Sequence, residues 1–550
     1  MSDSIKIIPL GGFDKIGMNM LVIEYGGSMI IVDCGTSFPP HNMPGVDTAI
    51  PDTGYIIKNK DKLKGIVLTH GHEDHIGAIP YLIENLAVPV YGTPLTIALV
   101  EKKLEEHKIK KYRTKVIRQG SSFILGDFRI EFIKANHSIP DAVMLAIYTP
   151  QGMIIHTGDF KIDYTPITGD SIDLKRLAAL GSKGVLAVLA DSTNALVDGS
   201  SPSESEVSTS LDNLINKYRE NRLIIATFAS NMDRVQQIIK LAKKHKKKVV
   251  LLGETMLGIF EAAKKLDYLN LLEGVLIDVS EISNYNNEDL IFLTTGNHGE
   301  PINCLNEIAE GMHEHIKLCR GDTILFSSIA IHGSEHIFSK TMNLLEEQGA
   351  NIVFQDLHAT GHACSEELKL IYTLTSPKYV IPAHGEYRYR KASANIAESI
   401  GIPRENIFLI NNGDVLEISD EATKVTDHIK LKEILIDGLG IGKVGRSVLA
   451  ERKKLAKEGI VIASICIDVR SKRLVAPPNI VTKGFWDEQK SKDFIEKSEE
   501  VLYLEISRLI SQGVFDERFS VQIKKALEKS IWERTMQRPF ILVLINNVML

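Results

Sequence analysis

The stretch Thr69-His70-Gly71-His72-Glu73-Asp74-His75 places three imidazoles and one or two usable carboxylates in a single short segment. Residues 65–68 before it form an apolar run typical of a buried strand, and apolar residues recur at helical spacing between Ile76 and Leu86. We therefore expect the segment to lie where a strand ends and a helix begins. Imidazole is the commonest metal ligand among side chains. The pattern favours a metal site over a polar surface loop with incidental histidines.

The candidate ligands in this segment follow the order His70-x-His72-x-Asp74-His75. A helix of the zincin type would need His-Glu-x-x-His, with two histidines one turn apart, and that spacing is absent. Ligands that alternate with small or polar residues along an extended loop can converge on two neighbouring metal sites. With this motif the sequence resembles the metallo-β-lactamase superfamily.

Length and composition set the bounds for the whole chain. At 550 residues it is too long for one core, and we expect about three domains. Its 44% hydrophobic and 24% charged residues are typical of a soluble globular protein. We find no signal-like start and no apolar run near the ~18 residues of a membrane span, so we expect a cytoplasmic protein without membrane contact.

Five scattered cysteines are expected to be reduced thiols. The net charge of -6 does not indicate a nucleic-acid binder, and the basic runs at 108–115 and 243–248 are equally well explained as solvated surface.

Three more polar residues each follow an apolar segment that reads as a strand. Asp33 follows residues 29–32, His137 comes after a run of alternating segments, and Asp159 follows residues 153–156. Taken alone, each is more typical of a turn or of the surface. In their order around the histidine loop they resemble, respectively, the superfamily's aspartate that orients metal ligands, its third histidine ligand and its bridging carboxylate.

The middle of the chain indicates a second domain inserted into the first. Residues 197–202, soon after Asp191, are rich in small and turn residues and are typical of a domain exit. Alternating strands and helices follow, which predicts a parallel sheet. Candidate metal ligands then reappear near His362 and His384, about 300 residues after the first ones. The expected strands are 223–226, 249–252, 323–326 and 351–354, with a helix at 235–242.

This arrangement resembles the β-CASP branch of the superfamily, whose members are nucleases acting on RNA and DNA, and within it the ribonuclease J family. The resemblance implies an α/β fold: a metallo-β-lactamase αββα sandwich interrupted by a β-CASP α/β domain, with a small C-terminal α+β domain. The motifs that carry it are 68–77, 156–161, 226–231 and 384–388. The expected domains are 1–202 and 358–448 for the two parts of the sandwich with a linker, 203–357 for the β-CASP domain and 449–550 for the C-terminal domain.

The resemblance also implies two divalent cations held by seven side chains. Imidazole with carboxylate favours zinc, and the carboxylate-rich second site leaves manganese open. Asp159 would lie between the two ions. The first ion is assigned to His70, His72 and His137, and the second to Asp74, His75 and His384.

Catalytic and substrate-binding residues are likewise implied by position in the family motifs. His362 would give a proton to the leaving 3′ oxygen, Asp191 would hold the ligand geometry, and Asp74 would act in catalysis through its metal. The positions implied for binding an RNA 5′-phosphate are Ser230, Asn231, His358, Thr360, Gly361 and His362. Some residues depart from the family pattern, such as Lys15 in place of a glutamate, Asn297-His298 in place of Ser-Gln, and Thr360 in place of a serine. These departures concern substrate handling, because none removes a metal ligand.

The tail from about Leu449 is expected to form a compact α+β unit. In the family this domain supports self-association, which implies a homodimer or higher oligomer, or a hetero-oligomer with a paralogue. A cap without an interface is the alternative. The expected strands are 460–467, 472–476 and 540–545, and the expected helices are 491–512 and 521–534.

Three functions are consistent with these features. The first is a metal-dependent ribonuclease that degrades single-stranded RNA from a 5′-monophosphate end in the 5′ to 3′ direction, with some internal cleavage, in rRNA processing and mRNA decay. The second is a catalytically weak paralogue that serves as partner subunit of a more active relative. The third is a small-molecule hydrolase. The insert argues against the third, and the complete ligand set favours the first over the second.

Overall fold

The computed structural model divides into two compact units. Unit 1 comprises Met1–Phe38 and Thr48–Ile434, and unit 2 comprises Pro39–Asp47 and Leu435–Leu550. The structure describes residues 4–37, 43–167, 169–295, 303–327, 335–354, 357, 359–438, 440–441, 445–468, 470–485 and 492–549.

The first sheet of unit 1 is antiparallel on one side and parallel on the other. Strand β3 pairs antiparallel with β2 and parallel with β5, so the change of direction lies next to the histidine loop. Across the sheet the strands are β20 (Thr423–His428), β19 (Asp414–Ile418), β1 (Ile5–Gly11), β2 (Met20–Tyr25), β3 (Ser28–Val32), β5 (Leu63–Val67), β6 (Val90–Gly92) and β7 (Thr114–Val116).

The second sheet of unit 1 joins segments from both sides of the insert. Strand β12 pairs in parallel with β18, with Ala187 opposite Tyr379, although the two residues lie far apart in the chain. The chain therefore leaves the sandwich after β12 and returns beside the same strand. Across this sheet the strands are β18 (Tyr379–Ala383), β12 (Ala187–Asp191), β11 (Gly152–His156), β10 (Val143–Thr149), β9 (Phe128–Lys134) and β8 (Ser122–Leu125).

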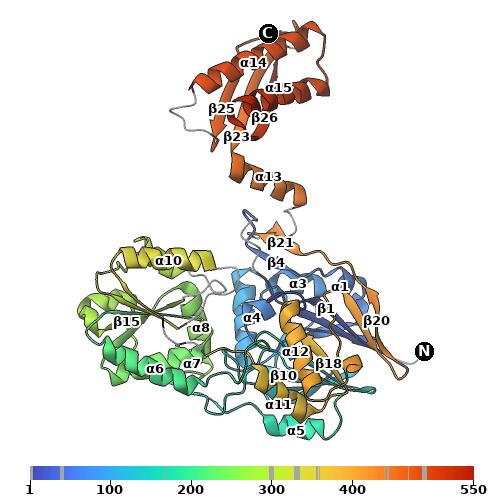
Figure 1. The fold of residues 1–550 in the computed structure, drawn as a ribbon, viewed down its shortest axis with the longest axis vertical. Coiled ribbons are helices and arrows are strands. Elements are labelled where there is room, and N and C mark those ends of the chain that lie inside the picture. Colours follow the sequence, from blue (N-terminus) through green and yellow to red (C-terminus); the bar gives the residue numbers. More distant parts are fainter. Residues whose placement is uncertain are drawn as a thin grey trace. The chain divides into compact units, whose positions relative to one another are not determined.

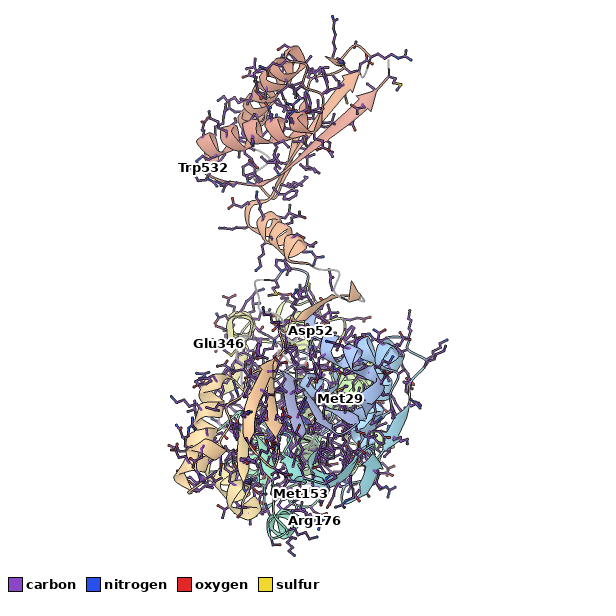
Figure 2. All side chains as sticks on the ribbon, turned by 90° about the vertical axis from the view of Figure 1, so that its right-hand side faces the viewer. Met29, Asp52, Met153, Arg176, Glu346 and Trp532 are labelled. Carbon is purple, nitrogen blue, oxygen red and sulfur yellow. The ribbon has the colours of Figure 1, made fainter. Side chains whose placement is uncertain are left out.

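A hydrophobic core lies between the two sheets, and helices cover their outer faces. Ile7 of β1 and Phe132 of β9 are fully buried in this core. Figure 2 shows how side chains fill the unit, with Met29 and Met153 labelled on β3 and β11. Strands buried on both faces read as nearly continuous apolar runs, as these do. The outer elements are α1 (Gly54–Lys58), α2 (Glu73–Ile76), α3 (Ile79–Leu86) and α4 (Pro94–Glu106), then α5 (Leu174–Gly181), α11 (Ser365–Thr375) and α12 (Tyr387–Ser399), with strand β4 (Thr48–Ile50) and 3-10 turns at Lys60–Lys62 and Arg404–Asn406.

The insert forms the green and yellow lobe of Figure 1, built on a parallel sheet with its own core. The prediction of a parallel α/β insert is confirmed. Its first helix begins after Ser203, whose hydroxyl accepts from the N–H of Ser205 as an N-cap. The strands across the sheet are β14 (Lys248–Leu251), β15 (Leu290–Thr295), β13 (Leu223–Thr227), β16 (Thr323–Phe326) and β17 (Asn351–Phe354). The helices are α6 (Glu204–Lys217), α7 (Met232–Lys244), α8 (Glu254–Lys265), α9 (Asn303–Ala309) and α10 (Glu335–Glu347), with 3-10 turns at Val279–Asn284 and Asn287–Asp289.

Unit 2 carries the predicted α+β fold, in which helices cover one face of a small sheet. The expected strand at 472–476 is shorter in the structure, and β25 was not predicted. Trp532 is labelled on α15 in Figure 2. The elements are β21 (Ile434–Asp437), β22 (Gly440–Ile441), α13 (Arg446–Glu458), β23 (Ile460–Asp468), β24 (Arg473–Leu474), β25 (Asn479–Lys483), α14 (Lys492–Ser511), α15 (Glu517–Thr535) and β26 (Phe540–Val548). The interrupted sandwich with an α+β tail is thus the predicted architecture.

Candidate metal centre

The candidate ligands follow strands that are neighbours in the two sheets. Asp33 directly follows β3, and His70 comes shortly after β5, which pairs with β3 in parallel. In the second sheet, Asp191 ends β12, which lies between β11 and β18. Asp159 comes after β11 and His384 directly after β18. Because parallel neighbours end at the same edge, residues that are distant in sequence meet there.

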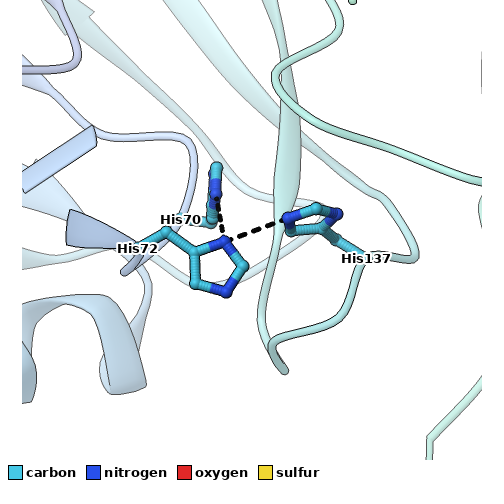
Figure 3. Close-up of side chains that lie close together, drawn as sticks. All are labelled: His70, His72 and His137. Atoms are coloured by element: carbon cyan, nitrogen blue, oxygen red, sulfur yellow. Dashed lines mark hydrogen bonds between the residues drawn. The ribbon is translucent and has the colours of Figure 1, made fainter. Parts of the chain in front are cut away.

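The first cluster consists of His70, His72 and His137, whose rings converge (Figure 3). Nδ1 of His72 lies 3.0 Å from Nε2 of His70 and 3.0 Å from Nε2 of His137. Nitrogens bound to one tetrahedral zinc ion, each about 2.0 Å from the metal, stand about 3.3 Å apart. Both distances are therefore close to the spacing that one bound ion requires.

Neighbouring groups hold the outward nitrogen of two rings in this cluster. Nδ1 of His70 lies 3.0 Å from the hydroxyl of Thr69. Nδ1 of His137 donates to the carbonyl of Gly361 over 2.6 Å, which leaves Nε2 of that ring without the proton. Such partners fix the orientation and tautomer of metal-binding histidines. The rings are thus oriented for a metal before one is bound.

Burial keeps the rings of the first cluster neutral. It lowers the pKa of His72 to about 3, even though the carboxylate of Asp159 acts in the opposite direction. Burial also holds the pKa values of His70 and His137 well below the usual value, and neighbouring imidazoles add to the shift. A metal ion binds the neutral form of imidazole, so no proton has to leave these rings at neutral pH.

The second cluster consists of Asp74, His75, Asp159 and His384. Nε2 of His75 lies 3.5 Å from Oδ2 of Asp74, and Nε2 of His384 lies 3.7 Å from the same oxygen. Nε2 of His384 is buried and has no hydrogen-bond partner among the residues that the structure describes. A buried polar atom without a partner is costly. A divalent cation between these ligands would satisfy it.

Two side chains hold the second cluster from outside. Asp33 accepts from Nδ1 of His75 and from the backbone N–H of Thr69, both over 2.8 Å. Nδ2 of Asn19 lies 3.2 Å from Oδ2 of Asp74 and 3.0 Å from Nε2 of His75. The family resemblance pointed to Asp33. Asn19 was missed, because a single asparagine before a strand has the same sequence signal as a turn residue.

Asp159 lies between the two clusters. Its Oδ2 is 3.8 Å from Nε2 of His70 and 3.8 Å from Nε2 of His137. The same oxygen is 3.3 Å from Nε2 of His75, and Oδ1 accepts from Nδ1 of His384 over 2.7 Å. Burial opposes ionisation, but the imidazoles of His384 and His75 hold the pKa of Asp159 well below its usual value. An ionised carboxylate therefore faces both clusters.

His362 lies beside the clusters and is paired with Asp191. Nδ1 of His362 donates to Oδ2 of Asp191 over 2.8 Å and lies 4.0 Å from Oδ2 of Asp159. Asp191 in turn accepts from the N–H and the hydroxyl of Thr193, over 2.9 and 2.7 Å. Burial lowers the pKa of a histidine, but the nearby carboxylates, Asp191 foremost, outweigh it and raise the pKa of His362 to about 9. His362 is therefore protonated at neutral pH.

A serine of the insert reaches the first cluster. The hydroxyl of Ser230 lies 3.0 Å from Nε2 of His72, the ring edge opposite the nitrogen that faces His70 and His137. Asn231 follows it and caps α7, because its side-chain oxygen accepts from the N–H of Arg234. Two of the positions predicted to bind a phosphate thus lie where the insert meets the metal centre.

The other predicted phosphate positions belong to the segment that returns from the insert. Gly361 packs so closely against the first cluster that a Cβ there would stand 2.7 Å from the ring of His137. The hydroxyl of Thr360 accepts from the backbone N–H of His362 over 3.2 Å. His358, also predicted at this site, lies outside the described residues.

The interrupted αββα sandwich and its paired ligand clusters define a metallo-hydrolase of the metallo-β-lactamase superfamily. The model of the metallo-beta-lactamase superfamily matches residues 16–192, and that of the Zn-dependent metallo-hydrolase RNA specificity domain matches 350–407. The models of the ribonuclease J beta-CASP domain and of the ribonuclease J C-terminal domain match 220–345 and 447–548. The chain belongs to the ribonuclease J family.

Full-length relatives agree with this membership. Ribonuclease J 1 of Streptococcus pyogenes is 38% identical over 548 residues, which cover 99% of this chain and 98% of the relative. Ribonuclease J2 of Bacillus subtilis is 38% identical over 552 residues, which cover 100% and 99%. A crystal structure of a protein of unknown function from Enterococcus faecalis shares the fold, with a TM-score of 0.53 and 17% identity over 76% of this chain and all of that one.

Family membership makes the chain a metal-dependent ribonuclease, a phosphodiester hydrolase of RNA processing. The RNA specificity domain indicates RNA binding, and the histidine and aspartate clusters indicate binding of divalent metal. Among the helices that the structure describes, none combines the length and apolar character needed to cross a bilayer.

Proposed function

We propose that this ribonuclease removes nucleotides in the 5′ to 3′ direction from RNA that begins with a 5′-monophosphate, and that it also cleaves internally. The contact between Ser230 and His72 carries the proposal, because it brings a hydroxyl of the insert to 3.0 Å from a ring of the first cluster. A terminal phosphate bound to that hydroxyl would lie next to the metal centre. The linkage that follows it would then be close to the ligands.

We assign one divalent cation to each cluster, with Asp159 shared between them. The ions would be zinc, since imidazole dominates, and manganese is the alternative at the carboxylate-containing second cluster. Bound there, the two cations would lower the pKa of a water molecule, so that hydroxide could attack phosphorus, and would neutralise charge on the attacked phosphate. Asp74 contributes to catalysis as a ligand of the second cation, together with His75 and His384.

His362 acts on the leaving group. It carries a proton at neutral pH, and the bond to Asp191 holds its ring in place. Attack on phosphorus expels the 3′ oxygen of the preceding nucleotide, which takes the proton from His362. A positioned acid of this kind contributes ~10²- to 10⁴-fold to the rate. The bond that breaks leaves the phosphate on the 5′ end of the remaining RNA, so each cleavage regenerates the end that the enzyme recognises.

The 5′-phosphate site consists of two segments from different parts of the chain. Ser230 and Asn231 come from the insert, whereas Thr360, Gly361 and His362 come from the returning segment; His358 completes the set in sequence. Short hydroxyls and backbone N–H groups are suitable donors to a phosphate dianion. A triphosphate should be too long for a site closed on both sides.

The two other functions considered from the sequence have less support. The matches to the RNA specificity domain and to the ribonuclease J beta-CASP domain argue against a small-molecule hydrolase. A catalytically weak partner subunit is not favoured by a chain that keeps all seven candidate ligands. It is nevertheless a defined outcome of the assay below.

Unit 2 is proposed to drive assembly into a homodimer or higher oligomer, or into a hetero-oligomer with a paralogue. Ile462 pairs with Leu542 and with Val481 on neighbouring strands. Leu542 and Val481 are 39% and 44% exposed, while alternate residues of β23 are buried in the core of the unit. An exposed apolar sheet face of this kind favours association.

Truncation before Leu449 should yield a monomer that still binds metal, and sedimentation that shows an unchanged oligomer would contradict this. The cytoplasmic location stays a prediction that cell fractionation can check.

The decisive assay compares RNA of one sequence with 5′-monophosphate, 5′-triphosphate and 5′-hydroxyl ends, in the presence of zinc, manganese or magnesium. We expect the monophosphate to be degraded fastest. Ser230→Ala should slow this end-dependent degradation by on the order of ten- to a hundredfold, because it removes a hydrogen bond to a charged group, and should affect internal cleavage less. Indistinguishable relative rates for wild type and Ser230→Ala would exclude the phosphate site. Inertness under every condition would favour the partner-subunit function.

A further inference from the structure

We propose that Asn194 makes the Thr360 hydroxyl an obligate hydrogen-bond donor and thereby sets the preference for a phosphate at the RNA 5′ end. Asn194 lies in the loop after β12, three residues beyond Asp191. Its Nδ2 donates to Oγ1 of Thr360 over 2.7 Å across 166 positions of sequence. The inference rests on the proposed function, because it assumes that Thr360 faces the bound phosphate.

The orientation of the Asn194 amide follows from a second contact. The same Nδ2 lies 3.4 Å from the backbone carbonyl oxygen of His362, which can only accept. With the amide reversed, two oxygens would face each other at that point. The NH₂ group must therefore point towards this segment, and each of its two protons has one acceptor, the hydroxyl of Thr360 and the carbonyl of His362.

Two donors then meet at one hydroxyl oxygen. Besides Asn194, the backbone N–H of His362 donates to Oγ1 of Thr360 over 3.2 Å. A hydroxyl has two acceptor positions and one proton. Since neither donor can accept in return, both acceptor positions of Thr360 are used, and its proton has to point elsewhere. Among the described residues no acceptor for this proton is found.

The consequence is selectivity for an acceptor with negative charge. A hydroxyl that can still accept binds either a donor or an acceptor, whereas one with both acceptor positions filled can only donate. The oxygens of an ionised phosphate can accept hydrogen bonds but cannot donate them. A hydrogen bond to a charged group is also stronger than one to a neutral group. Thr360 in this state therefore favours a 5′-phosphate over a 5′-hydroxyl. Asn194 acts through Thr360 and is a positioning residue.

Asn194→Asp tests the inference at nearly constant shape. The carboxylate can only accept, so the Thr360 proton would turn towards it. The charge of the carboxylate and the lone pairs of the Thr360 oxygen would then repel a phosphate. We expect the preference for 5′-monophosphorylated over 5′-hydroxyl RNA, measured as the ratio of kcat/KM, to fall by on the order of ten- to a hundredfold. The loss should appear in KM for the phosphorylated RNA, with kcat at saturation nearly unchanged. Asn59→Asp is a matched control, because the Asn59 amide also donates to a carbonyl, that of Tyr55, over 2.9 Å.

A double-mutant cycle shows whether the effect passes through the hydroxyl. Asn194→Ala should lower the preference in the wild-type background, and should change it no further once Thr360→Val has removed the hydroxyl. Additive effects would overturn the inference, as would an unchanged ratio in Asn194→Asp. If wild type itself degrades both RNAs equally, the proposed 5′-phosphate site fails and this inference fails with it. If wild type prefers 5′-monophosphorylated RNA and Asn194→Asp keeps the same preference, only the inference about Asn194 fails.

Discussion

The two ligand clusters differ in charge. In the first cluster, burial holds three imidazoles neutral. In the second, burial is outweighed by carboxylates, so that the pKa of His75 lies well above its usual value and that of His384 is also raised. The difference teaches that the first cluster is ready to bind a cation at neutral pH, whereas at the second a cation must displace protons. The four predictions below test this contrast.

Removal of the second cluster should have the largest effect. Asp74→Ala combined with His75→Ala takes away two ligands of one cation and none of the other. We expect metal analysis of the purified protein to fall from two ions per chain to one, and cleavage to become undetectable, with an unchanged circular dichroism spectrum. His428→Ala is the control, because this exposed histidine pairs with Asp414 at the surface over 2.7 Å. Two ions retained by the double variant would contradict the assignment.

Replacement of His362 should reduce the rate without changing the metal content. His362→Gln removes the proton donor, so kcat should fall ~10²- to 10⁴-fold. Both cations should stay, because His362 is assigned to neither cluster. The geometry makes this a sharp test, since His362 could also form a ligand group with His137 and Asp159. Loss of an ion from this variant would mean that the first cluster has a fourth member.

Asp33→Asn should weaken the second cluster more than the first, because Asp33 contacts His75 directly and reaches His70 only through the hydroxyl of Thr69. Asp33 accepts from Nδ1 of His75, and partners of this kind are worth about 10- to 100-fold in metal affinity. Competition with a chelator should show this loss for one ion and a smaller loss for the other. Asp173→Asn, which changes a carboxylate that caps α5, should leave both affinities as they are. Equal weakening of both ions would indicate that the clusters bind as one unit.

The smallest expected effect is a difference in pH dependence. His75 is protonated at neutral pH without metal, so each proton displaced from the second cluster costs about tenfold in affinity per pH unit of acidification. The rings of the first cluster are already neutral, so their affinity should change little between pH 6 and pH 8. Titration calorimetry in buffers of different ionisation enthalpy counts the protons released. If binding of each ion releases the same number of protons, the two clusters do not differ in protonation as described.

The ligand loop could be predicted from residue types alone, whereas most of the remaining centre could not. His70, His72 and His75 lie within six positions, which chance composition does not explain. His137, Asp159 and His384 needed the family resemblance, because an isolated histidine or a turn aspartate has no periodicity that marks it. Their assignment as ligands stays a prediction until metal is measured.

Residues that act through long-range contacts had no sequence signal. The bond between Asn194 and Thr360 spans 166 positions, and that between Asn19 and His75 spans 56. Only the folded chain brings such pairs together. In unit 2, the missed strand β25 directly follows Pro477 and Pro478, a pair that is typical of a turn. By contrast, the long helices α14 and α15 were predicted to within a few residues, because their apolar positions recur over several turns.

The pairing of β12 with β18 has a consequence during synthesis. A nascent chain that ends before residue 379 lacks the strand that completes the second sheet, and with it His384. Such a chain can already contain the whole first cluster, because His70, His72 and His137 all precede the insert. The second cluster cannot form until the polypeptide has returned from the insert. On the proposed ligand assignment, a partly synthesised chain would therefore lack a complete metal centre while it is still attached to the ribosome and close to the messenger that encodes it.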